Sequence, residues 1–477
     1  MRRSWSEADS YPPGRPGLCR LFLYLLLVSG CAASDAPRVA STDPDYRTPP
    51  RLDDGWQVTS TEEIGLSRAP LQRLTEALQA GEEYPNVHGL LIVKDGQLVY
   101  ERYFAGEDRR YGSDGERHDV TIEFDRDTFH DLRSVTKSVT SALVGVALAS
   151  DVLPPLETPL CDVFPSRADI CTARKRAITL RHALTMTAGL DWNEGEVPYT
   201  DPTNDEEQLY YKTADPVGYI LAKPIVADPG SEWDYNSGLP VLLGFALSRT
   251  VETPLSEFAR RQLFEPLGIT RWEWRGPPAF EGAPTPAGNL WLRPRDLAKI
   301  GALYLNGGEW NGRQVIPRDW VEDSVRPHVP RRGTMVEYGD LAVSEHAYGY
   351  LWWHDRYRFA DGVEVEVQNA VGNGGQRIWI VPELRLLVVR RGLGRPRREE
   401  PALPVAAVFH DPRPGGPLHV DVEDREEDAD AAAASAHMGV LDLGDVRHPA
   451  LRGRERDVGR SVLPRRGIAE KEGGEAD

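Results

Sequence analysis

One short stretch of the sequence pairs a candidate nucleophile with a candidate base. Ser134 and Lys137 stand three residues apart, and the chain contains no other Ser-x-x-Lys. Small and apolar residues recur at three- and four-residue spacing from Val139 to Ala147, which predicts a buried helix. Residues three apart lie along one face of a helix, so the hydroxyl and the amine are expected side by side. A serine hydroxyl becomes a useful nucleophile when a base takes its proton, and a lysine shielded from water can be that base.

The same two residues also have a purely structural explanation. Ser134 can cap the helix, and Lys137 can be an ordinary lysine that faces water. Two observations favour catalysis: the motif occurs once, and Lys137 opens a helix whose other residues are small or apolar. The sequence therefore favours a nucleophilic serine with an amine as its partner.

Length, charge and missing motifs exclude several classes of function. The 477 residues can form one large or two medium domains. The net charge of −18 argues against nucleic acid and anionic membrane surfaces as partners, and no 20-residue apolar run is present to span a bilayer. The chain has no His-Glu-x-x-His pair, no Gly-x-Ser-x-Gly elbow and no phosphate-binding glycine loop. We therefore expect neither a metal ion nor a cofactor, and a small molecule as the substrate.

The N-terminus has the pattern of a targeting segment. Basic residues precede the apolar run Leu21 to Val28, and small residues then lead to Cys31. Residues 1–30 resemble a bacterial lipoprotein signal, which implies cleavage before Cys31 and acylation of its thiol. An ordinary secretory signal with an incidental cysteine is the alternative. We expect an exported protein of the cell envelope, facing the periplasm or the exterior, with a lipid at Cys31 as its only attachment to a membrane.

The remaining chain divides by composition into a tether, a folded domain and a tail. Residues 31–60 are rich in Pro, Asp, Arg and Ser and are predicted to form a tether. Residues 61–392 form the predicted hydrolase domain, and the acidic, aliphatic-poor residues 393–477 are predicted to be disordered. In the domain, Cys161 and Cys171 can pair in an oxidising compartment or remain two buried thiols.

Strands are expected at both ends of the domain and helices between them. Two hairpins are predicted, at residues 87–104, which turn at Asp95-Gly96, and at residues 377–390. We expect them to join in one antiparallel sheet, with a mainly helical region from about 131 to 290 packed against it. Residues 105–127 are charged and glycine-bearing, which predicts a surface loop. Residues 190–212, with Trp and Tyr but few aliphatics, predict either a pocket wall or a plain surface loop.

Three motifs in this order resemble those of the serine β-lactamase and penicillin-binding-protein superfamily. They are Ser134-x-x-Lys137, Tyr235-Asn236-Ser237 and Asn373-Gly374-Gly375. The closest match is the class C-like branch of esterases, peptidases and 6-aminohexanoate-dimer hydrolases. The resemblance implies an α/β (α+β) fold of the β-lactamase/transpeptidase type, in which an antiparallel sheet flanked by helices meets a mainly helical region at the active site. It also implies hydrolysis of an ester or amide through an acyl-serine, whether or not β-lactams are substrates.

The resemblance also assigns roles to individual residues. Ser134 would be the nucleophile, Lys137 its hydrogen-bonded partner and Tyr235 the second proton carrier; either of the last two can be the base. The backbone N–H groups of Ser134 and Gln376 would bind the oxyanion. Contacts to the substrate would come from the second and third motifs, at Ser237, Asn373, Gly374 and Gly375. The alternative is a catalytically silent binding or sensor protein on the same scaffold.

Two positions depart from the usual motifs. Ser237 stands where the second motif usually has Asn, and Asn373 stands where the third usually has Lys or His. An asparagine offers hydrogen bonds without charge, so a carboxylate on the substrate loses its fixed cation. We therefore expect esters or short uncharged amides to be preferred over β-lactams, unless Arg133 or Arg377 supplies the positive charge.

Overall fold

The computed structural model describes residues 47–393, except 65, 67, 82–83, 112–116, 332–335, 339–340 and 360–362. The predicted signal segment, the lipidated Cys31 and residues 394–477 of the predicted tail lie outside the described residues. Within the part of the chain that is described, no helix is both long and apolar enough to cross a membrane.

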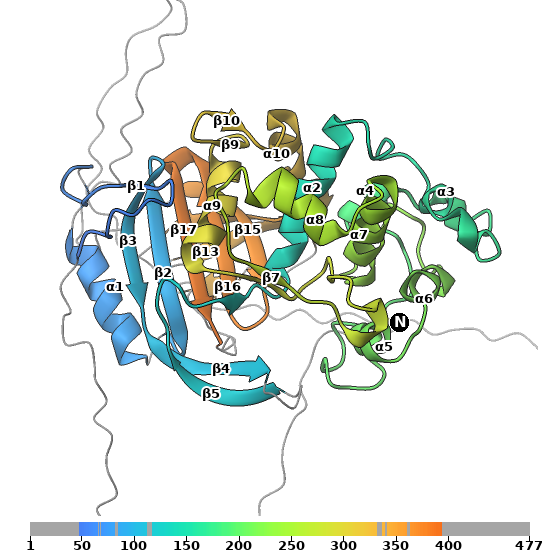
Figure 1. Ribbon diagram of the computed structural model, residues 1–477, viewed down its shortest axis with the longest axis horizontal. Helices are drawn as coiled ribbons and strands as arrows, with labels where there is room; N and C mark the ends of the chain where they lie inside the picture. Colours follow the sequence, from blue (N-terminus) through green and yellow to red (C-terminus); the bar gives the residue numbers. More distant parts are fainter. Residues whose placement is uncertain are drawn as a thin grey trace, which may run out of the picture. The chain divides into compact units, whose positions relative to one another are not determined.

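One large sheet forms the centre of the described region (Figure 1). Its strands follow the order β1 (Gln57–Val58), β3 (Gln97–Tyr103), β2 (Val87–Lys94), β17 (Leu386–Gly392), β16 (Gln376–Val381), β15 (Glu364–Gly372), β14 (Trp353–Phe359), β13 (Leu341–Tyr348) and β11 (Val329–Pro330), and β12 (Val336–Tyr338) also pairs with β13. All neighbours are antiparallel except β1, which runs parallel to β3.

The two predicted hairpins meet in this sheet. β2 pairs with β17, with Leu91 opposite Val389, so a strand near the start of the domain and its last strand are direct neighbours. The β2–β3 turn has positive φ at Asp95 (52°) and Gly96 (77°), as a two-residue hairpin turn requires. The prediction that both ends of the domain contribute to one sheet is confirmed.

Helices cover both faces of the sheet, which explains the nearly continuous apolar strands. α1 lies over one face, and α2 and α9 lie over the other. The helices of the described region are α1 (Arg68–Ala80), α2 (Val135–Ala149), α3 (Leu160–Val163), α4 (Leu180–Leu184), α5 (Asp205–Tyr211), α6 (Pro216–Ala222), α7 (Gly238–Thr250), α8 (Leu255–Ala259), α9 (Pro294–Leu305) and α10 (Arg318–Ser324). Leu90 and Ile92 of β2 belong to the apolar cluster under α1, whereas Leu91 and Val93 belong to the larger cluster with α2 and α9. Alternate residues of a strand point to opposite faces, so β2 buries both of its faces.

Two small sheets are separate from the large one. β6 (His130–Asp131), β8 (Leu290–Leu292) and β7 (Glu273–Trp274) form one, and β9 (Glu309–Trp310) with β10 (Arg313–Gln314) forms the other. β6 leads directly into Ser134, so its pairing with β8 fixes the chain just before α2. Cys161 and Cys171 form a disulfide, with Cα atoms 5.8 Å apart.

Residues 105–127, predicted to be a loop, instead contain two paired strands. β4 (Ala105–Tyr111) and β5 (Arg117–Glu123) pair over seven positions. Opposite charges stabilise this pairing: the Arg109 guanidinium lies 2.7 Å from the Asp119 carboxylate across the strands. β4 has no alternating apolar pattern and β5 has only Val120 and Ile122 at alternate positions, so the usual sequence signal of a hairpin is weak here.

Part of the predicted tether is also folded. Trp56 is buried, its indole N–H donates to the backbone oxygen of Arg295, and its ring packs edge-on against Trp310 at 4.9 Å. The tether prediction is therefore wrong for residues 47–60, because one tryptophan and strand β1 attach this segment to the domain. Residues 31–46 lie outside the described part.

Candidate active site

A sharp turn presents Ser134 at the start of α2. Arg133 has a φ of 51°, a conformation that is uncommon for a residue with a side chain. Asp131 holds the turn, since its carboxylate accepts the Arg133 N–H at 2.9 Å and lies 3.2 Å from the Arg133 guanidinium. The Asp131 side chain thus stabilises the approach to the helix, and Ser134 is left half-buried at its first turn.

Lys137 lies beside Ser134 and is shielded from water. Its Nζ is 3.0 Å from Ser134 Oγ and 3.0 Å from the backbone oxygen of Ala287. The side chain is buried, and burial lowers the pKa of the amine, although the negative charges of Glu194 and Glu206 partly oppose this. The structure therefore brings the hydroxyl and the amine of the first motif together and excludes the solvated lysine of the alternative explanation.

The second motif places a phenol on the same hydroxyl. The pKa of Tyr235 is raised by burial and then by the charge of Glu194, and the nearby Ser134 hydroxyl partly opposes this shift. The Lys137 amine lies 5.0 Å from the centre of the Tyr235 ring. Asn236, the next residue, caps α7 by accepting the N–H groups of Gly238 and Leu239 at 2.8 and 3.2 Å.

The third motif forms the turn between β15 and β16, next to the nucleophile. A Cβ on Gly372 would lie 2.5 Å from the backbone oxygen of Leu132, so only glycine permits this close approach of the strand end to the residue before the Arg133 turn. Gly374 and Gly375 have φ of 82° and 87°. Asn373 is exposed, whereas Gln376 is buried and donates from its side chain to the backbone oxygen of Gly392.

Ser237 lies in a different place from the one predicted for a substrate contact. Its side chain is buried, and its Oγ donates to Glu194 Oε1 at 2.6 Å while its backbone N–H donates to Oε2 at 2.7 Å. Its hydroxyl therefore binds a protein carboxylate in this structure. The other predicted residues, around the β15–β16 turn, remain candidates for contacts to a substrate.

Two carboxylates near Lys137 were not identified from the sequence. Glu194 is buried and Glu206 is half-buried. Burial, and then the charge of Glu194, raises the pKa of Glu206 to about 8. Both belong to residues 190–212, for which the sequence left a pocket wall and a plain surface loop as alternatives. Glutamates between tryptophan and tyrosine residues were the available signal.

Aromatic rings surround the outer side of Tyr235. Trp233 and Trp353 lie 6.3 and 6.0 Å from its ring centre. The guanidinium of Arg331 lies 4.3 Å from the ring centre of Trp233 and 4.2 Å from that of Trp353. The approach to Ser134 on this side is therefore lined by flat apolar rings with one cation between them.

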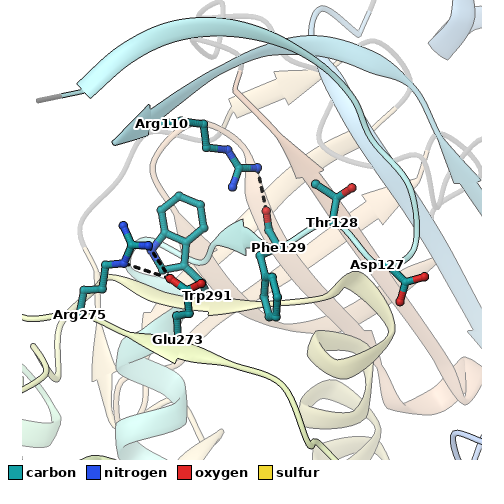
Figure 2. Close-up of a pocket in the computed structure, with 7 residues that line it drawn as sticks. All are labelled: Arg110, Asp127, Thr128, Phe129, Glu273, Arg275 and Trp291. Carbon is teal, nitrogen blue, oxygen red and sulfur yellow. Dashed lines mark hydrogen bonds and ion pairs between the residues drawn. The ribbon is translucent and has the colours of Figure 1, made fainter. Parts of the chain in front are cut away.

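A separate cavity of about 280 Å³ lies upstream of the nucleophile, between Arg110, the segment 127–129 and the β7–β8 strands (Figure 2). Figure 2 shows Arg275 bonded to Glu273, and Arg110 donates to the backbone oxygen of Phe129 at 2.8 Å. The two arginines flank the indole of Trp291. The other polar groups drawn there bond to residues outside the cavity, Asp127 to Arg293 and Thr128 to Asp125. Its lining therefore shows no hydroxyl–amine pair like that of Ser134 and Lys137.

Comparisons with known proteins agree with this arrangement. The model of the Beta-lactamase family matches residues 71–394. The 6-aminohexanoate-dimer hydrolase of Paenarthrobacter ureafaciens is 25% identical over 342 residues, which is 70% of this chain and 79% of that enzyme.

Solved structures share the fold. A family VIII carboxylesterase has a TM-score of 0.51 and 15% identity, covering 71% of this chain and 96% of the other. A penicillin-binding-protein homologue from Caulobacter crescentus has a TM-score of 0.51 and 16% identity, covering 72% and 99%. At these identities the likeness concerns the fold, and it confirms the β-lactamase/transpeptidase-like architecture expected from the three motifs.

Proposed function

Because the chain belongs to the Beta-lactamase family, we propose that it is a serine hydrolase that cleaves ester or amide bonds through an acyl-serine intermediate. The observation that carries this proposal is the 3.0 Å contact between the shielded Lys137 amine and the Ser134 hydroxyl. The hydrolase and carboxylesterase named among the relatives support the same reaction type.

Acylation begins when Ser134 Oγ attacks the carbonyl carbon and Lys137 Nζ accepts the hydroxyl proton. Lys137 is the better base in the resting protein because burial lowers the pKa of its amine, whereas the pKa of Tyr235 is raised and its phenol keeps its proton. The carbonyl electron pair moves onto oxygen, and the N–H groups of Ser134 and Gln376 are the proposed donors to that oxyanion.

The tetrahedral intermediate then collapses and expels the alcohol or amine. The leaving group takes a proton from Tyr235, which regains it from Lys137; a water molecule repeats the sequence to release the acid. Lys137 is hydrogen-bonded to Ser134, and its amine lies 5.0 Å from the centre of the Tyr235 ring, so neither proton carrier needs a large movement.

For the substrate we propose an ester or a short uncharged amide. The Arg133 guanidinium pairs with Asp131, and Arg377 donates to the backbone oxygens of Gly372 and Gln376. Neither arginine therefore supplies the positive charge that a Lys or His would provide at the position of Asn373.

The disulfide between Cys161 and Cys171 supports the proposal that the protein is exported, because such bonds persist in oxidising compartments. Export through residues 1–30 and lipidation at Cys31 remain predictions. Intact-mass analysis of the protein from a bacterial envelope fraction would test both.

A substrate panel tests the proposed reaction. Short p-nitrophenyl esters, an aminohexanoate dimer and nitrocefin are compared, together with labelling by a fluorophosphonate. We expect turnover and labelling of the wild type and neither for Ser134→Ala. Ser138→Ala is the matched control, because its hydroxyl donates to Leu351 O at 2.8 Å one turn further along α2 and away from the chemistry. Absence of both turnover and labelling in the wild type would favour the silent binding protein.

A further inference from the structure

Glu194 is a buried carboxylate held by neutral donors. Its Oε2 accepts the indole N–H of Trp192 at 2.8 Å and the backbone N–H of Ser237 at 2.7 Å. Its Oε1 accepts the Ser237 hydroxyl at 2.6 Å and the Tyr199 hydroxyl at 3.3 Å. No lysine or arginine among the described residues forms an ion pair with it. A buried charge is costly unless it is well hydrogen-bonded, so an unpaired carboxylate kept at this position suggests a role beyond packing.

The position of Glu194 connects it to Tyr235. Ser237 is the N-cap of α7 and stands two residues after the phenol. Both of its donors, the N–H and the Oγ–H, point to Glu194, which tethers the Tyr235 segment to the loop before α5. Asn236, between these two residues, accepts the Gly238 N–H at the start of α7. The Tyr235 phenol is therefore held in place through its two neighbours, Asn236 and Ser237.

The charge of Glu194 also acts on the groups that move protons. It raises the pKa values of Lys137 on α2, Tyr235 before α7, and Glu206 and Tyr210 on α5. It does the same for two further tyrosines that face the site, Tyr199 and Tyr348. Lys137 is the one basic group among these, and Glu206 is the second carboxylate.

We propose that Glu194 is a positioning residue of this active site, which holds Tyr235 against Ser134 through Ser237 and provides the fixed negative charge that the Lys137 amine senses. The proposal rests on the proposed serine-hydrolase function. It differs from a purely structural role, in which Glu194 would only close the loop and the charge would be irrelevant.

Two substitutions test the length of the Glu194 side chain separately from its negative charge. Glu194→Gln keeps the length and an oxygen for Ser237 but removes the charge. We expect its acidic limb of kcat/KM to move to lower pH, because a negative charge that raises the pKa of Lys137 is gone. Glu194→Asp keeps the charge but shortens the side chain. We expect at least a roughly tenfold lower kcat with the limb unmoved, since proton transfer depends on geometry.

Ser237→Ala and Asp205→Asn complete the set. Ser237→Ala removes one of the two donors on the Tyr235 side, so kcat is expected to fall while KM changes less. Asp205 is the control: it opens α5 after the loop that carries Glu194, it is buried, and it accepts the Asn193 N–H at 2.7 Å and pairs with Lys223, but it contributes no charge effect to the pKa of Lys137. Asp205→Asn is expected to leave the pH limb unchanged.

Fluorophosphonate labelling distinguishes the two possible failures. If the wild type labels at Ser134 but Glu194→Gln has the wild-type pH limb, the inference about Glu194 is overturned and the hydrolase proposal stands. If the wild type does not label, the hydrolase proposal itself fails. Should Glu194→Gln not fold, the same decision follows from Glu194→Asp and Ser237→Ala, because wild-type kcat in both would overturn the positioning role.

Discussion

The Lys137 Nζ lies 3.0 Å from the Ser134 Oγ, on a side chain that is 2% exposed. The contact joins a nucleophile to an amine whose ammonium form is disfavoured by burial. Because a group with a lowered pKa loses its proton at lower pH, the base is available closer to neutrality than an exposed lysine would be.

Lys137→Met is expected to lower kcat/KM by at least about a hundredfold, the usual scale for loss of general-base catalysis. Lys175→Met is the matched control, because burial also lowers the pKa of Lys175 and its amine also donates to a backbone oxygen, that of Leu221. Stopped-flow measurement of the acylation phase checks this, and near-normal acylation by Lys137→Met would show that the proton goes elsewhere.

Tyr235→Phe is expected to reduce turnover by about a hundredfold without unfolding the protein, because the ring stays and the hydroxyl bonded to Ser134 is lost. Tyr100→Phe removes a buried hydroxyl that bonds to Thr75 at 2.8 Å under α1, far from the chemistry along the fold. Steady-state kinetics and thermal unfolding of both variants compare the two losses. If Tyr235→Phe and Tyr100→Phe both reduced turnover only slightly and equally, Tyr235 would not be part of the proton relay.

Glu206 makes the stability of the domain depend on pH. Its pKa is raised from 4.5 to about 8 in the folded protein, so the folded state binds a proton that the unfolded state has already released between these values. The stabilisation from the protonated form is complete below about 4.5 and is lost as the pH rises to about 8. Denaturant unfolding at pH 5 and pH 8.5 should show a smaller difference for Glu206→Gln than for the wild type and for Glu207→Gln. An identical difference in all three would contradict the buried proton.

Asn373→Lys is expected to raise nitrocefin hydrolysis relative to p-nitrophenyl butyrate hydrolysis by one to two factors of ten. A charge-assisted hydrogen bond to the β-lactam carboxylate contributes about 1.5–3 kcal/mol to the transition state. Asn373→Met controls for side-chain length without charge. If the wild type already prefers nitrocefin, or the lysine leaves the ratio unchanged, the absence of a cation at the third motif does not set specificity.

Local patterns were sufficient to predict two hairpins of the sheet and the side-by-side placement of Ser134 and Lys137. The Asp95-Gly96 turn between apolar runs identified the first hairpin, and the apolar stripe after Ser134 identified α2. These signals are carried by residues close in sequence. The strands β4 and β5 were missed because charged residues such as Arg109 and Asp119 dominate this segment, and such a composition resembles that of a solvated loop.

The contact between Glu194 and Ser237 could not be predicted either, and the reason is a different one. Glu194 and Ser237 lie 43 positions apart and meet only when the loop before α5 packs on the start of α7. A glutamate in a polar segment is exposed by default, and its burial follows from tertiary packing that no local spacing encodes. The same packing converts Ser237 from an expected substrate contact into a buried donor.

The central claim is that Ser134 carries the acyl group during turnover. The most direct measurement is to quench the wild type with acid during the burst of p-nitrophenyl butyrate hydrolysis, digest with pepsin at low pH and map the butyryl group by mass spectrometry. We expect one butyryl group, on the peptide that contains Ser134, and none in Ser134→Ala. A butyryl group on another residue, or undiminished hydrolysis by Ser134→Ala, would contradict it.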